Sequence, residues 1–282
     1  MASQVAGTGG RETTLPPAGS KPSGRLARWH ESGRIATYAW PAATLAAFIA
    51  LWEIASQTGF VNPIIVPAAS EVFVALIELS QEEFFWSATE VTVKETLIGF
   101  FIGVVGAWVL GTLIGVFRVF RLAFYPLIVA FQITPRIALA PLFLTWFGFG
   151  ITSKIVMAAT ICFFPVLINV IVGLDTVDKD ARTLMRSFGA SRWEEYRKLT
   201  LPSSLPIVFA GIKTAMTLAL IGAIVAEFVG ASEGMGVLIK TLNFQLQVAE
   251  GFAVILALSL IGLVLYGITE LIESRLVFWT GR

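Results

Sequence analysis

The sequence predicts an all-α integral membrane protein with about six transmembrane helices. Two observations support this prediction. Hydrophobic residues make up 56% of the 282 residues and charged residues only 14%, whereas an average soluble domain carries about 25% charged residues. The apolar residues also fall into separate blocks of about 20, the length of helix that crosses the hydrocarbon core of a bilayer. We expect helices because a spanning helix satisfies its own backbone hydrogen bonds.

The order of polar and apolar stretches predicts the domain organisation. Residues 1–34 are rich in Gly, Pro, Ser and Thr and lack the apolar core of a cleavable signal, so they form a predicted disordered cytoplasmic tail. Residues 35–282 form the predicted transmembrane domain, with an acidic external segment and an amphipathic helix near 70–79. The predicted spans are 35–57, 96–117, 122–146, 154–174, 204–228 and 251–273.

The positions of lysine and arginine predict the orientation in the cell inner membrane. Cytoplasmic loops near span ends carry the excess of these residues. With the N-terminus inside, most of the 20 lysines and arginines fall on the inner side. Only Lys94, Lys154 and Lys240 fall on the outer side. Both termini and the long loop 175–202 are therefore predicted to be cytoplasmic.

The second predicted span carries a small residue at every fourth position. These residues are Gly99, Gly103, Ala107, Gly111 and Gly115. A stripe of this kind lets another helix approach closely. The partner is either a helix of the same chain or the matching helix of a second copy, and the sequence leaves both alternatives open.

The third predicted span, 122–146, is not expected to be a straight helix. Its three prolines are Pro126, Pro135 and Pro141. Each proline removes a backbone donor and kinks a helix, and broken helices at membrane depth often line a pathway. Arg136 is therefore a candidate pathway residue that attracts an anion; alternatively it pairs with a carboxylate or extends to an interface. Glu227, before a Gly-rich turn, is predicted to shape a gate or to pair with Arg136.

The cytoplasmic loop contains signals for two short helices. Asp178 is a predicted N-cap of the first helix, and Gly189 supplies the left-handed residue that ends it. Ser191 and Glu194 form a predicted capping box for the second helix, which Pro202 is expected to stop. Aromatic residues beside arginines suit a protein interface. The alternative is that these helices rest on anionic lipid at the membrane surface.

The loop resembles the EAA loop of bacterial ABC importer permeases. The resemblance rests on the spacing from Gly189 to Leu199-Thr200-Leu201-Pro202, while Thr183, Leu184 and Met185 occupy the E-A-A positions. Residues 135–142, 146–150 and 226–232 are similar to the nitrate/sulfonate/taurine subgroup of that family. The resemblance covers most of the chain outside the N-terminal tail.

This resemblance implies a fold, a function and a set of partners. The fold is a type I ABC importer permease bundle, and the function is import of a small, anionic, pyrimidine-type or vitamin-type solute by alternating access. Implied partners are cytoplasmic ATP-binding subunits that hold ATP and Mg, a periplasmic or lipid-anchored solute-binding protein, and a second permease copy. The residues implied to dock on the ATPase are Leu184, Arg186, Phe188, Gly189, Ala190, Ser191, Trp193, Glu194, Leu201 and Pro202.

The competing functional classes are an ion-coupled secondary transporter or channel subunit and a membrane enzyme. No internal repeat of the kind found in secondary transporters is evident. The chain has one histidine, His30, and one cysteine, Cys162, so neither a histidine relay nor a Cys-based metal cluster is expected. It also lacks a phosphate-cradling Gly-x-x-x-x-Gly-Lys-Ser/Thr loop. We therefore expect no catalytic residues, cofactor or metal in this chain.

Overall fold

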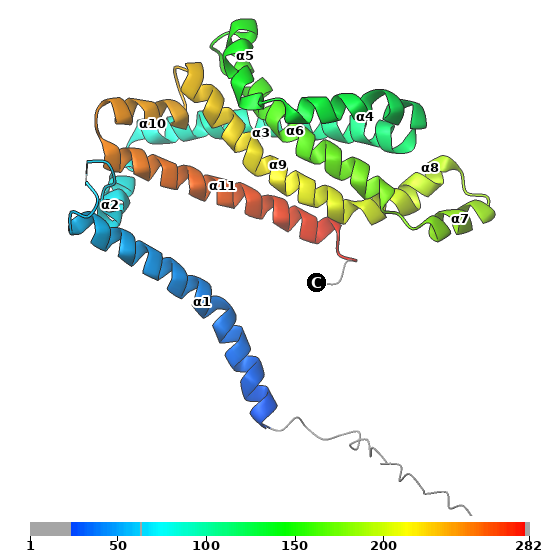
Figure 1. The fold of residues 1–282 in the computed structure, drawn as a ribbon, viewed down its shortest axis with the longest axis horizontal. Coiled ribbons are helices and arrows are strands. Elements are labelled where there is room, and N and C mark those ends of the chain that lie inside the picture. The colour runs from blue at the N-terminus through cyan, green and yellow to red at the C-terminus, as the bar shows by residue number, and fades with distance from the viewer. Residues whose placement is uncertain (1–23, 63, 280–282) are drawn as a thin grey trace, which may run out of the picture. The chain divides into compact units, whose positions relative to one another are not determined.

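The computed structural model describes the backbone of residues 24–62 and 64–279 and the side chains from residue 39 onward. Within these residues every regular element is a helix (Figure 1). The chain divides into two compact units, residues 1–55 and residues 56–282.

The described part of the first unit belongs to helix α1, Gly24–Gln57, whose last two residues fall in the second unit. Its apolar part, Ala39–Gln57, is long enough at 19 residues to cross a membrane, as the first predicted span requires. The helix begins at Gly24, inside the predicted disordered tail, and continues through Pro41. The rest of that predicted tail, residues 1–23, lies outside the described residues.

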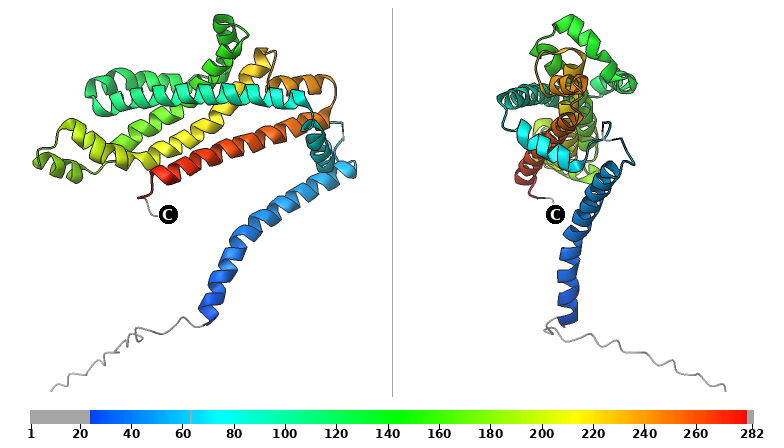
Figure 2. Two further views of the ribbon diagram at one scale, coloured as in Figure 1. Left: turned by 180° about the vertical axis from the view of Figure 1, so that it is seen from behind. Right: turned by 90° about the vertical axis from the view of Figure 1, so that its left-hand side faces the viewer.

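Four long helices form the body of the second unit. They are α3 (Glu83–Val116), α6 (Ile151–Asp175), α9 (Leu201–Gly230) and α11 (Val248–Leu276). Helix α6 packs against both α3 and α9, and α11 packs against α9 (Figure 2). Each of the four covers a predicted span, α3 all but its last residue. Helix α3 also begins thirteen residues before its span, because the polar stretch before it is helical.

The small-residue stripe of α3 packs against α6. A Cβ atom built at Gly103 would lie 2.4 Å from the Cys162 sulfur, and one at Gly111 would lie 2.7 Å from Cγ1 of Val170. Ala107 is fully buried in the same row. Such short distances require glycine at these positions, because real Cβ atoms do not approach so closely. The stripe is thus a packing surface inside the chain, one of the two alternatives that the sequence leaves open.

The third predicted span is broken, as its prolines predict. Helix α4 (Arg118–Ile133) is followed by the short 3-10 helix η1 (Arg136–Leu139) and by α5 (Ala140–Phe147). The two parts are bent by 87°. Pro135 lies at the break, where a missing backbone N–H does least harm to helical hydrogen bonding.

Two shorter helices complete the second unit. Helix α2 (Ala69–Leu79) is the predicted amphipathic helix and packs against α11. Helix α10 (Met235–Phe244) packs against α9, α11 and α3. The sequence predicts no helix at α10, because its 10 residues are too few for a span.

Candidate functional site

The predicted cytoplasmic loop folds into two short helices, α7 (Lys179–Ser187) and α8 (Arg192–Glu195). At the start of α7, Oδ1 of Asp178 accepts a hydrogen bond from the backbone N–H of Asp180 at 2.8 Å, so the predicted N-cap is present. Gly189 has φ +79°, the left-handed conformation that its sequence position predicts. The N–H groups of Gly189 and Ala190 donate to Arg186 and Met185, which closes α7 in a Schellman motif.

The predicted capping box starts α8. The backbone N–H of Glu194 donates to Oγ of Ser191 at 3.2 Å, and the N–H of Ser191 donates to Oε2 of Glu194 at 3.0 Å. The predicted stop at Pro202 is wrong. A π-helical turn, Tyr196–Thr200, joins α8 directly to α9, and Pro202 lies in the first turn of α9. Proline is tolerated there because its missing N–H needs no partner at a helix start.

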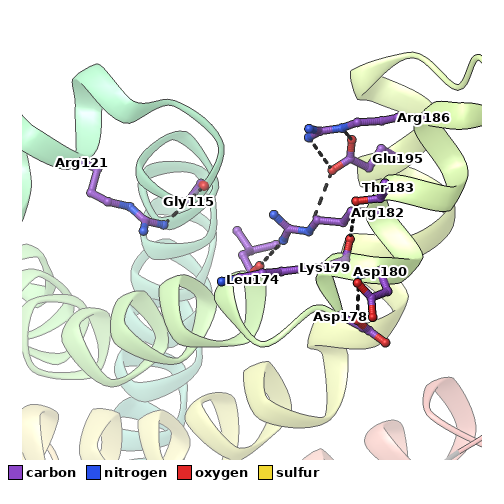
Figure 3. A network of polar contacts seen from close by, with 10 residues as sticks. All are labelled: Gly115, Arg121, Leu174, Asp178, Lys179, Asp180, Arg182, Thr183, Arg186 and Glu195. Carbon is purple, nitrogen blue, oxygen red and sulfur yellow. Dashed lines mark hydrogen bonds and ion pairs between the residues drawn. The ribbon is translucent and has the colours of Figure 1, made fainter.

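An arginine-carboxylate cluster joins α7 to α8 (Figure 3). Arg186 donates from Nε to Oε2 of Glu195 at 2.8 Å and from Nη2 to Oε1 at 3.2 Å, a bidentate pair. Nε of Arg182 lies 3.9 Å from Oε1 of the same carboxylate. Nη2 of Arg182 donates to the carbonyl of Leu174 at 2.6 Å. The cluster therefore connects both loop helices to the end of α6.

The cluster also fixes the charge of its members. The hydrogen bond to Glu195 raises the pKa of Arg186 above its ordinary value. The same bond lowers the pKa of the Glu195 carboxyl below its ordinary value. Both groups are thus ionised at neutral pH.

A separate ion pair joins α4 to α6. In this pair Arg121 donates to Oδ1 of Asp175 at 2.7 Å.

Large apolar side chains project from this cluster into solvent. Phe188 is 82% exposed, Trp193 is 66% exposed and Leu184 is 58% exposed. The ring of Trp193 stacks on Tyr196 with ring centroids 5.7 Å apart. Capping motifs and ion pairs therefore hold three apolar groups outside the core, an arrangement suited to a protein interface.

A second polar cluster lies at the opposite end of α9 and is buried. Oγ1 of Thr92 in α3 donates to Oε1 of Glu227 at 2.6 Å and accepts from the N–H of Met235 at 2.8 Å. Oε2 of Glu227 accepts from the N–H of Gly236 at 2.6 Å. Glu227 is only 1% exposed. It therefore joins α3, α9 and α10 and is not paired with Arg136.

Two further ionisable residues of this cluster were not among the predicted site residues. The carboxyl of Glu95 is buried and interacts with that of Glu227. Lys154 is also buried; its Nζ donates to the carbonyls of Phe149 and Gly150, and its charge interacts with both carboxylates. A signal was available, since Glu95 and Lys154 each lie in the first turns of an apolar block. Their proximity depends on α3 packing against α6 and α9, which local patterns do not show.

Arg136 lies at the break of the third span. Its Nη1 donates to the carbonyl of Ile161 at 3.3 Å, and its guanidinium lies 4.9 Å from the centre of the Phe164 ring. Lys213, in contrast, is paired with Glu273 at 2.8 Å, as expected for a charge within a span. The structure thus assigns Arg136 to a contact with α6.

Sequence comparison places the chain among transport permeases. Residues 99–278 match the family "binding-protein-dependent transport system inner membrane component". The formylaminopyrimidine transport permease protein ThiX of Halalkalibacterium halodurans is 34% identical over 81% of this chain and 91% of the relative. The riboflavin transport system permease protein RibX of Chloroflexus aurantiacus is 32% identical over 86% and 92%. The aliphatic sulfonates permease SsuC of Bacillus subtilis is 28% identical over 86% and 88%.

Solved structures show the same fold. An amino acid ABC transporter crystallised with histidines matches with TM-score 0.59 at 16% identity, over 72% of this chain and 98% of that one. The MetNI methionine ABC transporter in an inward-facing form matches with TM-score 0.58 at 18% identity, over 71% and 99%. These findings fit the importer prediction and not the ion-coupled alternative. The chain belongs to the family of binding-protein-dependent transport system inner-membrane components, the multi-pass permeases of ABC importers.

Proposed function

We propose that this chain is the permease subunit of an ATP-driven importer whose cytoplasmic loop docks on separate ATPase subunits. The solute is small, and either anionic or of the pyrimidine or vitamin type. Relatives named for formylaminopyrimidine, riboflavin and aliphatic sulfonates support this range. Solute crosses by alternating access, with both termini and the loop in the cytoplasm, as the distribution of lysine and arginine favours.

The observation that supports docking most directly is the exposed apolar surface of α7 and α8, which we call the docking face and define as Leu184, Phe188 and Trp193. Arg182, Arg186 and Glu195 hold the two helices together. Apolar groups rimmed by charged residues are the usual anatomy of a protein interface. Anionic lipid is the weaker candidate, because Arg182 and Arg186 are already engaged by Glu195 and therefore have less free charge to offer.

The continuous helix formed by α8, the π turn and α9 supports a mechanical role for the docking face. It runs from Arg192 to Gly230, 39 residues, which corresponds to roughly 60 Å of helix. The docking face lies at one end of this helix and Glu227 at the other. Movement of the ATPase subunits against Trp193 is thereby transmitted to the contacts of Glu227 with α3 and α10.

The remaining partners follow from the same proposal. ATP and Mg bind to the ATPase subunits, a periplasmic or lipid-anchored protein delivers the solute, and a second copy of this permease completes the pathway. The docking element of this chain then includes Gly189, Ala190, Ser191, Glu194, Leu201 and Pro202. The first four form the turn and cap between α7 and α8, while Leu201 and Pro202 begin α9.

The test is copurification of the ATPase with the tagged permease from its native membrane. Phe188→Ala removes the most exposed aromatic ring of the docking face. Truncation of an aromatic residue at the centre of an interface costs about 2 kcal/mol or more, or roughly 30-fold in affinity. We therefore expect little ATPase to copurify with this variant.

A matched control is Phe244→Ala, since Phe244 of α10 is 80% exposed but lies far from the loop in the chain. This variant is expected to retain the ATPase fully. Equal ATPase recovery from both variants would remove the docking assignment. Transport by the reconstituted chain alone, without ATP, would overturn the proposed function itself.

A further inference from the structure

A pocket with a volume of about 540 Å³ lies between α3, α6 and the broken third span, remote in sequence from the docking face. This volume falls within the range of about 300–1,000 Å³ found for small-molecule sites. Four phenylalanines contribute to its wall: Phe131, Phe143, Phe163 and Phe164. Arg136 is the one charged residue among the described residues that line it.

The pocket lies near the middle of the spanning helices, a position that suits the solute pathway. Gly103 and Gly106 line it near the middle of α3, and Phe163 and Phe164 near the middle of α6. The chain between α4 and η1 is broken at the same place, with a bend of 87°. Such backbone at membrane depth is tolerated where it is buried in protein or lines a water-filled cavity. A half-buried arginine at this depth is costly for the same reason, unless an aqueous cavity or an anion accompanies it.

The charge of Arg136 has no acidic partner among the residues that the structure describes. Its one protein hydrogen bond joins Nη1 to the carbonyl of Ile161 at 3.3 Å. A guanidinium carries five N–H donors, so donors are left for a further group. The guanidinium also lies over the Phe164 ring at 4.9 Å from its centre, a cation–π contact that uses none of its N–H donors in a conventional hydrogen bond.

The other polar groups of the pocket do not compete for an anion. The hydroxyls of Thr134 and Thr160 donate to the carbonyls of Ala130 and Val156 within their own helices. Their oxygens are then acceptors, which repel an anionic group and direct it toward Arg136. The phenylalanine rings provide flat apolar surfaces on which an aromatic ring stacks in offset or edge-to-face geometry.

We propose that this pocket, which we call the Arg136 pocket, binds a flat aromatic monoanion, with Arg136 holding its carboxylate or sulfonate group and the phenylalanines holding its ring. Its role as a transit site for imported solute rests on the proposed function. Binding itself does not, because it requires neither ATP nor the partner subunits. A lipid acyl chain in the same recess would leave the charge of Arg136 without a partner. Occupation by a second copy of this chain is an outcome that the experiment below separates.

The experiment is saturation-transfer NMR on the full chain, with its bound partners, in nanodiscs of neutral phosphatidylcholine. Benzoate is the probe. Cyclohexanecarboxylate has the same charge without an aromatic face, and benzamide has the flat ring without the charge. We expect benzoate to bind about tenfold more tightly than either, the effect of losing one favourable contact. Equal binding of the three compounds, or no saturation transfer to benzoate because lipid or a second copy fills the pocket, would overturn the proposal.

Variants locate the binding. Arg136→Gln is expected to weaken benzoate binding about tenfold, while Arg136→Lys restores part of the loss because it keeps the charge. Arg118→Gln, at the exposed start of α4, is the matched control and should change nothing. If Arg136→Gln does not fold, Phe164→Leu is the second variant and should abolish the preference for benzoate over cyclohexanecarboxylate. Undiminished benzoate binding in these variants would overturn the proposal and leave Arg136 a purely structural role. The proposed docking of the ATPase does not depend on that result.

Discussion

The two ends of the helix formed by α8 and α9 are held by opposite kinds of polar contact. At the loop end, Arg186 and Glu195 are nine residues apart in the sequence, and the Arg186 side chain is 64% exposed. At the far end, Thr92 and Glu227 are 135 residues apart and both are buried. The first contact joins neighbouring turns of one loop, whereas the second joins helices from distant parts of the chain.

The two contacts therefore have different roles: the loop pair sets the angle between two helices, and the buried cluster stabilises the fold. In the Arg186–Glu195 pair the carboxylate is buried but the Arg186 side chain is 64% exposed, so water screens the pair from one side and its main role is to set the angle between α7 and α8. A buried polar group left without a partner costs about 1–3 kcal/mol, so each contact in the Thr92–Glu227 cluster is needed for stability. The loop end can therefore adapt to a moving partner, while the far end keeps α3, α9 and α10 together.

The largest expected effect is that of Thr92→Val at the buried end. Valine keeps the shape of threonine but leaves Glu227 and the N–H of Met235 each without one hydrogen bond. Two such groups should cost about 3 kcal/mol in the free energy of unfolding. Cys162 is the single cysteine and is fully buried, so a thiol-reactive fluorophore reports unfolding directly. The thermal midpoint should fall by roughly 5–10 °C.

Thr96→Val is the control for this experiment. Thr96 is also fully buried in α3, but its hydroxyl bonds only to the carbonyl of Thr92 in its own helix. That carbonyl also accepts a backbone hydrogen bond of the helix, so the decrease in the free energy of unfolding should be below about 1 kcal/mol. Equal midpoints for the two valine variants would mean that the buried cluster does not hold the helices together.

The contrast between the two ends also explains what the sequence can predict. Asp178, Gly189, Ser191 and Glu194 form caps and turns with residues at most a few positions away, so their roles follow from spacing. Glu95 and Lys154 meet Glu227 only after three helices have packed, and no local pattern predicts that meeting. The spans were predictable for a related reason, because each depends on its own apolar length.

Errors arose where one residue has two possible roles. Pro202 was predicted to stop a helix, yet it begins one, because proline is compatible with a first helical turn. For Glu227, the alternative of an ion pair with Arg136 is wrong, because Glu227 contacts Thr92 and Gly236, while its role at a gate stays a prediction. In both cases tertiary packing, which a local pattern does not show, decides the neighbours of the residue.

The helical core between the two ends provides the next largest effect. In Gly111→Ala the new Cβ would meet Cγ1 of Val170 at 2.7 Å and its Cβ at 2.9 Å, so α3 and α6 must separate slightly. Overpacking of this kind costs about 1–3 kcal/mol. The fluorophore assay should show a lower thermal midpoint. The decrease should be smaller than or similar to that of Thr92→Val.

Gly267→Ala is the matched control, because Gly267 of α11 is exposed and has no atom within 4 Å of an added Cβ. Alanine favours a helix over glycine by about 1 kcal/mol, so this variant should be as stable as the original chain or slightly more stable. A Gly111→Ala variant with an unchanged midpoint would show that the small-residue stripe does not determine the distance between α3 and α6.

The smallest effect on stability is expected at the loop end, in Gly189→Val. The residue has φ +79° and open space around it, so valine meets no neighbour but must adopt a strained backbone. Such strain costs about 1–2 kcal/mol and acts on the turn between α7 and α8 rather than on the core. The unfolding midpoint should therefore change little, while uptake per ATP hydrolysed falls by about 5–30-fold, the population change that this energy produces. Gly150→Val is the control, since Gly150 has equally open space with φ −74°, which valine accepts. If both variants import solute normally, the docking face does not require the angle that Gly189 sets between α7 and α8. The loop end would then tolerate a change of geometry that the buried end does not.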